Sequence, residues 1–485
     1  MKNNFFKIYL FMLNKMYVFC LLFLVACSNT NISNHPNILM ISVDDLNDWV
    51  GIYEGHPNSH TPNIDQLGLN AVVFKNAYSQ SPLCGPSRAS ILSGLRPTSS
   101  GIYGQITDNQ LKDFSTKNDI LLMPEFFKKH GYKTFGVGKI SHGHMPDGVF
   151  DESGGRVKGF GPKPVNGAYF NWNKNGTSTD WGAFPISDSL MPDFKSANWI
   201  KKRLQETHKD PFFMAVGFLR PHVPWYVPQK WFDLHPLDEI KLPPYFREDL
   251  DDLPDFAFNF IYGYDMMPTT EWAIKNKQWK KIVQSYLASI SFVDHYVGEV
   301  IDALNNSIYK ENTIIVLFSD HGYRIGEKGI FAKQALWDEA VKVPLIIKPP
   351  NFNKSIEIKN IVELIDIYPT LIDLAGLPNY KKNEGKSLVP LIENKNNFNK
   401  NFSLTTFGWG NHSISVDNYK YIVYRDSSEE LYYLKNDPNS WKNLANNKSY
   451  DSIKIRLRNL LPKRIKNDNE FPLINKFLDE KWLNY

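Results

Sequence analysis

The stretch Asn37-Ile38-Leu39-Met40-Ile41-Ser42-Val43-Asp44-Asp45 is an apolar run that ends in two acids. A continuous apolar run of this length is typical of a strand buried on both faces of a parallel sheet. A second run, Thr313–Ser319, ends in the same way in Asp320 and His321. In open α/β sheets, ligands bind outside the carboxyl ends of the strands. The two runs therefore predict an α/β fold with acidic side chains at one sheet edge.

Strand-like and helical patterns alternate between Asn37 and about Pro350, which indicates a largely parallel sheet. The expected strands are residues 37–43, 133–137, 212–218, 313–319 and 343–347. The expected helices are residues 63–71, 87–93, 122–130 and 278–305. Two stretches rich in Gly, Pro, Asn and Trp, residues 145–193 and 228–279, predict long excursions above the edge that carries the acids.

The segment Ser81 to Gly94 contains Cys84-Gly85-Pro86-Ser87-Arg88, a Cys-x-Pro-x-Arg pattern at the start of an expected helix. An isolated cysteine in this position is also compatible with a buried structural residue. The three aspartates of the sheet edge suit a hard cation such as Ca²⁺ or Mg²⁺, which takes oxygen ligands. A thiolate beside such a cation would be a soft ligand at a hard metal. Conversion of Cys84 to an oxygen-bearing group would remove this mismatch.

The Cys-x-Pro-x-Arg pattern, together with the two acidic strand ends, resembles the type I, formylglycine-dependent sulfatases, and most closely their iduronate-2-sulfatase-like members. The resemblance runs from Pro36 to about Asn446. It implies that a maturation enzyme oxidises Cys84 to formylglycine, whose hydrated aldehyde attacks the sulfur of a sulfate ester. It also implies the alkaline-phosphatase-like fold, in which helices sandwich a large mixed, mostly parallel sheet and a small C-terminal antiparallel β subdomain with a helix follows.

The resemblance further implies a divalent metal, Ca²⁺ first and Mg²⁺ second, that acts as Lewis acid and template. Most family members have Asn where this chain has His321, and the iduronate-type pattern has Asp-His. The implied ligands are Asp44, Asp45, Asp320, His321 and the formylglycine derived from Cys84.

Two more strand ends lead to the same edge. Residues 133–137 are followed by Lys139 and His142, and residues 212–218 are followed by Arg220 and His222. A lone histidine after a strand is usually a surface or capping residue, but here two strand ends point to an edge that already holds acids.

The expected roles follow from the negative charge of the sulfate ester and of the leaving alkoxide. Arg88 would hold the diol oxygen, and Lys139 and Lys333 would hold sulfate oxygens. His222 is the candidate general acid for the leaving oxygen, and His142 is the candidate base for the second diol hydroxyl.

Further cations predict a polyanionic substrate. Arg220 flanks His222, Arg324 follows Asp320 closely, and Lys328 lies in the same Gly-rich segment. We expect these charges to favour a sulfated saccharide that also carries a carboxylate or further sulfates, although solvated loop charges are the alternative. The resemblance suggests a uronic-acid-bearing polymer, either a glycosaminoglycan or an algal polysaccharide such as ulvan, and leaves the choice open.

Two rival functions share part of this pattern. A phosphomonoesterase or phosphonate hydrolase of the same superfamily uses a similar metal edge, but such phosphatases usually bind two metals, and only one metal set is evident here. A surface glycan-binding lipoprotein without catalysis is the second rival. The formal net charge of +4 over 485 residues argues against a dedicated nucleic-acid-binding protein.

The N-terminus predicts export and lipid anchoring. Lysines precede an apolar segment in residues 1–26, which is typical of a signal peptide. Leu24-Val25-Ala26-Cys27 resembles the bacterial lipobox, so Cys27 would carry the lipid and a palmitate-type chain would hold the protein in the cell envelope, at the outer membrane or on the periplasmic side. An uncleaved anchor or ordinary cleavage nearby is the alternative. The three cysteines leave no pair for a structural disulfide.

The predicted division of the chain has four parts. A signal peptide (1–26) precedes a lipidated cysteine with a polar tether (27–36). The catalytic α/β domain covers 37–395, and the C-terminal subdomain covers 396–485, where short β-like runs replace the α/β pattern.

Overall fold

The computed structural model describes residues 35–164, 170, 179–262, 267–395 and 398–466. The predicted leader, the lipobox and Cys27 lie outside the described residues. Within the described ranges, no helix has both the length and the apolar character needed to span a membrane.

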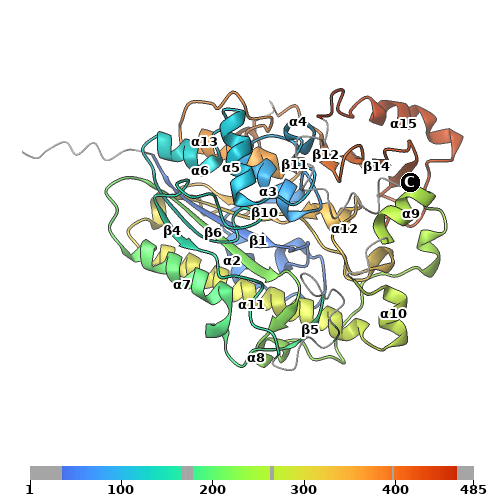
Figure 1. Cartoon of the computed structure of the whole chain (residues 1–485), viewed down its shortest axis with the longest axis horizontal. Helices are drawn as coiled ribbons and strands as arrows, with labels where there is room; N and C mark the ends of the chain where they lie inside the picture. Colours follow the sequence, from blue (N-terminus) through green and yellow to red (C-terminus); the bar gives the residue numbers. More distant parts are fainter. Residues whose placement is uncertain (1–34, 165–169, 171–178, 263–266, 396–397, 467–485) are drawn as a thin grey trace, which may run out of the picture.

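A nine-stranded mixed sheet forms the centre of the large domain (Figure 1). Its strand order is β11-β2-β10-β8-β1-β6-β3-β4, and β9 pairs with β2. The strands are β1 (Asn37–Asp44), β2 (Val72–Tyr78), β3 (Lys133–Gly138), β4 (Glu152–Gly155), β6 (Phe212–Pro221), β8 (Thr313–Ser319), β9 (Lys342–Val343), β10 (Leu345–Lys348) and β11 (Ile356–Glu363). A separate two-stranded sheet joins β5 (Trp181–Ala183) and β7 (Trp225–Val227).

The central strands of the large sheet are parallel. β1 pairs in parallel with β8 on one side and β6 on the other, and β6 pairs in parallel with β3. β10 runs antiparallel to both β8 and β2. The carboxyl ends of β1, β3, β6 and β8 consequently meet at one edge, which confirms the predicted fold class.

Both faces of the sheet are covered by helices (Figure 1). Along β1, Ile38 and Met40 enter one apolar cluster, whereas Leu39 and Ile41 enter the other. This division explains why the strand reads as an unbroken apolar run instead of an alternating one. One layer contains α2 (Pro62–Gly68), α7 (Pro192–Gln205) and α11 (Trp279–Asn305), and the other contains α3 (Cys84–Ser93), α5 (Asp108–Lys117), α6 (Met123–Lys129) and α13 (Ile367–Leu374).

The longest helix of the described chain, α11, packs one face on the sheet. Its buried Ile282, Tyr286, Ile290, Val293 and Val297 recur at helical spacing. The remaining helices are short and lie in the connections between these elements or beside the C-terminal sheet described below. They are α4 (Pro97–Ser100), α8 (Gln229–Phe232), α9 (Asp255–Tyr262), α10 (Thr270–Lys275), α12 (Asp338–Val341), α14 (Val389–Ile392) and α15 (Asp451–Arg458).

A four-stranded antiparallel sheet forms the C-terminal part. Its order is β12 (Phe402–Thr406), β13 (His412–Val416), β14 (Tyr419–Val423) and β15 (Glu429–Tyr433), and α15 follows. The predicted boundary near residue 395 stays a prediction. The backbone N–H of Thr406 donates to the carbonyl of Gln80 at 2.9 Å, so this sheet is attached directly to the segment that leads to Cys84.

A buried ion cluster also connects the two parts. Glu363, fully buried at the end of β11, accepts from Arg96 at 2.5 Å and from Lys400 at 2.6 Å. Its carboxylate also accepts from the backbone N–H of Leu404 at 2.9 Å. Burial opposes ionisation of Glu363, but the charges of Arg96 and Lys400 outweigh it and hold the pKa of the carboxyl well below its usual range.

We expect Glu363→Gln to lower the free energy of unfolding at pH 7 by about 3–5 kcal/mol, because it leaves Arg96 without its buried counter-charge and Lys400 with Asp366 alone. The depressed pKa stabilises the fold above the unfolded-state pKa of about 4.3, and this contribution is lost as pH falls towards the folded-state pKa. Urea unfolding at pH 7 and pH 4 should therefore show a larger difference between variant and wild type at pH 7.

Glu357→Gln, on the same strand, is the matched control. Its carboxylate is half-exposed and lies 3.7 Å from Lys75, so its loss should cost less than about 1 kcal/mol. Equal effects of the two substitutions would contradict the assignment of Glu363 as the structural link.

Candidate active site

The site lies where the carboxyl ends of β1 and β8 meet the start of α3. Asp44 closes β1, and Asp45 follows with a φ of 62°, in the left-handed region that aspartate tolerates better than most residues. The backbone N–H of Asp45 donates to Asp320 Oδ1 at 3.2 Å. Because β1 and β8 are neighbours, Asp320 meets Asp44 and Asp45 although it lies 275 positions after Asp45 in the chain.

Cys84 is the first residue of α3 and is only 1% exposed. Its sulfur lies 3.1 Å from Lys333 Nζ, 3.2 Å from His321 Nε2 and 3.9 Å from Asp45 Oδ1. Burial raises the pKa of the thiol, and the charge of Asp44 adds to this effect. The unmodified thiol is therefore a poor nucleophile in this environment.

Arg88, one helical turn beyond Cys84, joins the acids to each other. Its Nε donates to Asp320 Oδ2 at 2.7 Å, and its Nη2 donates to Asp44 Oδ1 at 3.1 Å. Nη1 donates to the carbonyl of Lys139 at 2.5 Å. The donors of Arg88 are thus directed at protein atoms. Its guanidinium therefore neutralises and positions the carboxylates of Asp44 and Asp320.

Two lysines complete the charge balance. Lys139 Nζ donates to Asp44 Oδ2 at 2.5 Å, and Lys333 Nζ donates to Asp45 Oδ1 at 2.7 Å. The turn after β3 passes close to Gly217 on the neighbouring strand β6. A Cβ at Gly217 would lie 1.9 Å from the carbonyl oxygen of Lys139, so this position requires glycine. This close approach is what carries Lys139 from β3 into the site.

The histidines differ in their contacts. His222 Nδ1 lies 2.7 Å from the carbonyl of Val223, and Nε2 lies 3.8 Å from Asp45 Oδ2. Burial holds the pKa of His222 well below its usual value. Burial and the charge of Lys139 lower the pKa of His142 to about 3, so its ring is neutral at physiological pH and lies within electrostatic reach of the site.

The pKa values of Asp44 and Asp45 are shifted in opposite directions. Burial opposes ionisation of Asp44, but Lys139 and Arg88 outweigh it and hold its pKa well below the usual range. For Asp45, burial dominates over the opposing charge of Lys333 and raises the pKa to about 7. Asp45 Oδ2 is buried and has no hydrogen-bond partner among the described residues.

The side chains fit a divalent cation. Ligand atoms of Asp44, Cys84, Asp320 and His321 lie within 4.8 Å of one another, and so do those of Asp44, Asp45, Cys84 and His222. The unpartnered Asp45 oxygen is the kind of buried acceptor that a cation would satisfy. Both groups include the sulfur of Cys84, which suits a hard cation only after replacement by oxygen.

The cations predicted to bind substrate are occupied by protein groups. Arg220 is buried, and its guanidinium donates to the carbonyls of Tyr226, His222 and Phe160 at 3.1, 3.1 and 2.8 Å. Arg324 is also buried and donates to the carbonyls of Ala332 and Gln334. Lys328 Nζ donates to Asp249 at 2.5 Å. Substrate contact by Arg220 or Arg324 stays a prediction.

Two residues near the site were not predicted from the sequence. Phe160 stacks on His222 with ring centroids 4.5 Å apart, and Arg156 lies over the same Phe160 ring at 5.3 Å. Both belong to the loop-rich stretch 145–193, which was expected to rise above the edge. No motif marks them there, because a single arginine and a single aromatic residue in a loop have no characteristic spacing.

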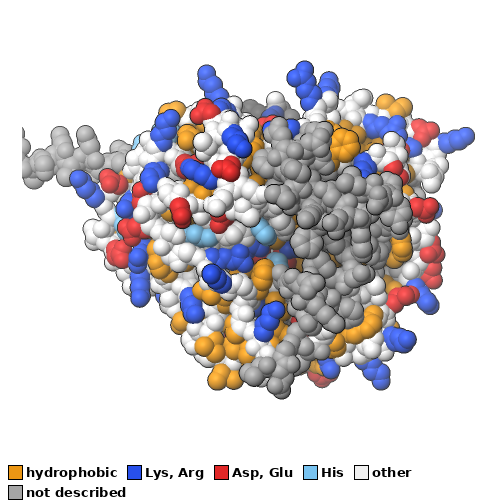
Figure 2. Space-filling model, in the orientation of Figure 1, with side chains coloured by type: hydrophobic (Ala, Val, Ile, Leu, Met, Phe, Trp, Pro, Cys, Tyr) orange, Lys and Arg blue, Asp and Glu red, His pale blue; other side chains and the backbone are white. Residues whose placement is uncertain are grey.

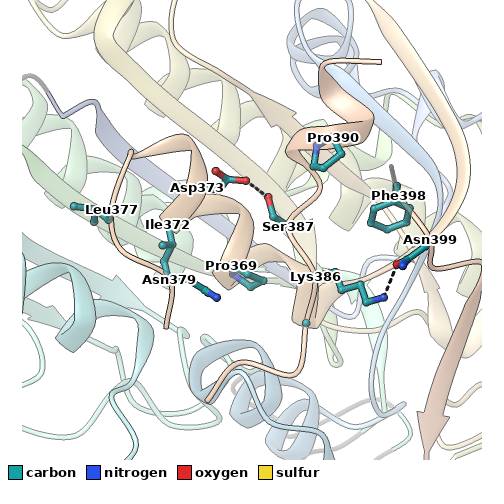
Figure 3. A pocket seen from close by; sticks show the side chains of 11 residues that line it. Pro369, Ile372, Asp373, Leu377, Asn379, Lys386, Ser387, Pro390, Phe398 and Asn399 are labelled. Atoms are coloured by element: carbon teal, nitrogen blue, oxygen red, sulfur yellow. Dashed lines mark hydrogen bonds between the residues drawn. The ribbon is translucent and has the colours of Figure 1, made fainter. Parts of the chain in front are cut away.

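A separate cavity of about 460 Å³ lies between α13 and α14 (Figure 3). Its polar side chains are engaged with each other: Ser387 donates to Asp373 at 2.6 Å, and Lys386 donates to Asn399 at 2.7 Å. None of its lining residues belongs to the cluster around Cys84. Elsewhere on the surface, charges of both signs are spread over the face shown in Figure 2, with Lys, Arg and His side chains close together near its middle.

Comparisons with protein families and curated proteins agree with this geometry. The sulfatase family model matches residues 36–377, and the model of the N-sulphoglucosamine sulphohydrolase C-terminal region matches residues 326–467. A sulfatase of Formosa agariphila is 51% identical over 88% of this chain and 86% of its own length. Human iduronate 2-sulfatase is 31% identical over 70% of this chain and 69% of its own length. An ulvan-active sulfatase of F. agariphila is 30% identical over 74% of this chain and 65% of its own length.

Solved structures share the fold. A phosphonate monoester hydrolase of Agrobacterium radiobacter superposes with a TM-score of 0.70 at 20% identity, covering 87% of this chain and 94% of its own. A 2-O GAG sulfatase superposes with a TM-score of 0.66 at 22% identity, covering 88% and 91%. The fold therefore does not separate sulfate from phosphonate chemistry, whereas the matches of sequence do. The chain belongs to the sulfatase family, whose members are sulfuric ester hydrolases.

Proposed function

We propose that this chain removes sulfate esters from a sulfated saccharide, with formylglycine at position 84 as the nucleophile and one divalent cation. The observation that carries the proposal is the position of Cys84, whose sulfur is within 3.9 Å of Lys333, His321 and Asp45. A buried cysteine among acids and cations, with a raised pKa, is unsuited to act as a thiolate. An oxygen nucleophile at the same Cβ is suited to both the cation and the sulfate.

The modification is a two-electron oxidation. A maturation enzyme passes two electrons and two protons from the Cys84 side chain to an external oxidant such as dioxygen. Water supplies the aldehyde oxygen in the overall balance, and the sulfur leaves as hydrogen sulfide. Addition of a second water to the aldehyde gives the geminal diol.

The first half-reaction transfers the sulfuryl group to the enzyme. One diol oxygen forms a bond to sulfur and releases its proton to the solvent, from which His222 takes up a proton, while the bond from sulfur to the ester oxygen breaks. His222 supplies the proton for the leaving alcohol, and the arriving anionic sulfate lowers the cost of forming its imidazolium. Lys139 and Lys333 stabilise the charge on the sulfate oxygens.

The second half-reaction restores the aldehyde. A neutral base takes the proton of the remaining diol hydroxyl, its oxygen forms the carbonyl, and the carbon–oxygen bond to sulfate breaks. The pKa of His142, about 3, keeps the ring neutral and able to accept a proton but makes it a weak base, so its assignment rests on its place beside Lys139 and Asp44. Water then hydrates the aldehyde for the next cycle.

The cation would be held by Asp44, Asp45, Asp320, His321 and the oxygen that replaces the Cys84 sulfur. When bound, a divalent cation supplies Lewis acidity toward a sulfate oxygen and holds the nucleophile in place. The three aspartates balance the charges of Arg88, Lys139 and Lys333. A divalent ion would therefore add a surplus of positive charge that suits an anionic ester, with Ca²⁺ as first choice and Mg²⁺ as second.

Relatives support a glycan as the substrate. Human iduronate 2-sulfatase is named for a uronic-acid-type substrate and the ulvan-active sulfatase of F. agariphila for ulvan. The two are similar to this chain to nearly the same degree, at 31% and 30% identity. We propose a uronic-acid-bearing sulfated polysaccharide or its oligosaccharides, a glycosaminoglycan or ulvan. Desulfation of a panel of defined sulfated oligosaccharides would identify the sugar and the sulfate position.

Mass spectrometry of the peptide that contains residue 84 should show formylglycine in active enzyme. Cys84→Ala should abolish turnover and change the free energy of unfolding by less than about 1 kcal/mol, since only one sulfur atom is removed. Ser90→Ala is the control and should retain activity, because the buried Ser90 hydroxyl on the same helix has no hydrogen-bond partner among the residues that the structure describes. Full activity with an unmodified thiol at position 84 would reject the mechanism.

One equivalent of Ca²⁺ or Mg²⁺ should be found in active protein by elemental analysis. Asp320→Asn and Asp45→Asn each remove a ligand charge and should weaken cation binding at least about 10-fold while lowering the rate. Asp188→Asn, a buried carboxylate that accepts from Trp231 and Tyr296, should leave metal content unchanged. Two equivalents of Zn²⁺ would favour the phosphomonoesterase or phosphonate hydrolase alternative, and full activity after confirmed metal removal would reject the site.

We also propose that Cys27 is lipidated and anchors the protein to a bacterial envelope membrane through residues 28–36. Cys27→Ser should release active enzyme into the soluble fraction, because a diacylglycerol chain supplies most of the membrane affinity. Ser28→Ala is the neighbouring control and should stay with the membrane. A Cys27→Ser variant that remains membrane-bound after a high-salt wash would contradict this proposal.

A further inference from the structure

Arg156 lies beside the site, and no carboxylate of a described residue lies within ion-pair distance of its guanidinium. Its Nη1 donates to the carbonyls of His142 and Gly143 at 2.9 and 3.0 Å. Nη2 reaches the carbonyl of Gly159 only at 3.5 Å, and Nε has no hydrogen-bond partner among the described residues. Among the ion pairs of the described chain, none includes Arg156.

The guanidinium of Arg156 lies against the same Phe160 ring that Lys139 and His222 approach. It lies 5.3 Å from the centroid of the Phe160 ring, and Lys139 Nζ lies 5.9 Å from the same centroid. The Phe160 ring stacks on His222, with an interplanar angle of 18°. Burial lowers the pKa of Arg156, while the nearby charge of Asp44 acts in the opposite direction, which agrees with a cation at the border of the acid cluster.

This environment differs from that of the other arginines around the edge. Arg88 is paired with Asp44 and Asp320, and the guanidinium of Arg220 donates to three carbonyls. Arg156 is also less deeply buried than either, so part of its side chain reaches solvent. Among the described residues, it therefore combines a charge that has no ion-pair partner with partial exposure to solvent.

We propose that Arg156 binds a second anionic group of the substrate, a carboxylate or a further sulfate ester, on the saccharide whose scissile sulfate lies at residue 84. The inference rests on the proposed sulfatase function and deepens it by assigning a specificity residue. A guanidinium matches carboxylate and sulfate oxygens with parallel N–H donors. The carbonyls of His142 and Gly143 and the Phe160 ring hold it in place before the substrate arrives, which reduces the ordering cost of binding.

A purely structural role is the competing explanation. Because Arg156 contacts the backbone of His142, it could do no more than brace the loop that carries the proposed base. Loss of a brace would lower turnover of every sulfate ester by a similar factor. Loss of an anion-binding group would act selectively on substrates with a second anion.

The test compares kcat/KM for 4-nitrophenyl sulfate with kcat/KM for sulfated saccharides that carry a carboxylate or a second sulfate. The saccharide is the one that wild-type enzyme hydrolyses fastest in a panel of uronic acid sulfates, disulfated glucosamines and neutral monosulfated sugars. Arg156→Met keeps the stem over Phe160 and removes the charge. We expect the ratio of kcat/KM for the saccharide to kcat/KM for 4-nitrophenyl sulfate to fall about 10–100-fold, mainly because KM for the saccharide rises.

Arg156→Lys should give a smaller fall, because the charge remains and the paired donors are lost. Arg203→Met is the matched control, since Arg203 on α7 also lies over an aromatic ring, Trp199 at 4.4 Å, and should leave the ratio unchanged. Separate ratios for the uronic acid sulfate and the disulfated sugar identify which anion Arg156 binds.

Three outcomes would overturn the inference. An equal fall for the aryl and saccharide substrates assigns a structural role to Arg156. Unchanged kcat/KM for both substrates in Arg156→Met, or a wild-type preference for neutral monosulfated sugars, rejects the second anion site and leaves the sulfatase function intact. Failure of formylglycine-bearing enzyme to hydrolyse any sulfate ester rejects the proposed function itself, and this inference with it.

Discussion

Three carboxylates buried at one sheet edge would repel each other, and the arrangement of the site depends on how that repulsion is relieved. Arg88 is central, because its Nε and Nη2 join Asp320 and Asp44 while Nη1 holds the carbonyl of Lys139. A single side chain thus connects β1, β8, α3 and the turn after β3. Removing one member of such a buried network leaves the others as uncompensated charges, which is far more costly than the loss of one hydrogen bond. The same network that stabilises the edge also positions residue 84.

The surroundings shift the pKa values of the two neighbouring aspartates in opposite directions. Asp44 is held ionised by Lys139 and Arg88, whereas burial raises the pKa of Asp45 to about 7 and leaves its Oδ2 without a partner. A folded protein rarely retains a buried acceptor of this kind unless a ligand satisfies it. A divalent cation at this edge would satisfy Asp45 Oδ2 and add, to a cluster whose aspartates balance its three cations, the positive charge that an anionic ester requires.

The sequence predicted the elements whose pattern is set by burial. The runs 37–43, 133–137, 212–218 and 313–319 became β1, β3, β6 and β8, because central strands covered on both faces must be apolar throughout. β2 and β11 were not predicted: both carry polar residues, such as Lys75 and Lys359, and their pairing depends on partners distant in the chain. The expected strand 343–347 is divided at Pro344 and runs antiparallel, a direction that no local pattern encodes.

The roles of the basic residues were harder to predict from the sequence than those of the acids at the strand ends, and the reason is physical. Arg220, Arg324 and Lys328 have the same sequence character as a substrate-binding cation, yet each donates to carbonyls or a carboxylate of the protein. Whether a cation braces the fold or binds a ligand depends on how many of its donors remain available, and that is a property of three-dimensional contacts. The Nη2 contact of Arg156 is long, and no carboxylate of the described residues forms an ion pair with its guanidinium, so its charge and some of its donors remain available. Arg156 also donates to backbone carbonyls, but its Nε has no partner among the described residues and its Nη2 contact is long, so it keeps donors that the proposed second anion could use.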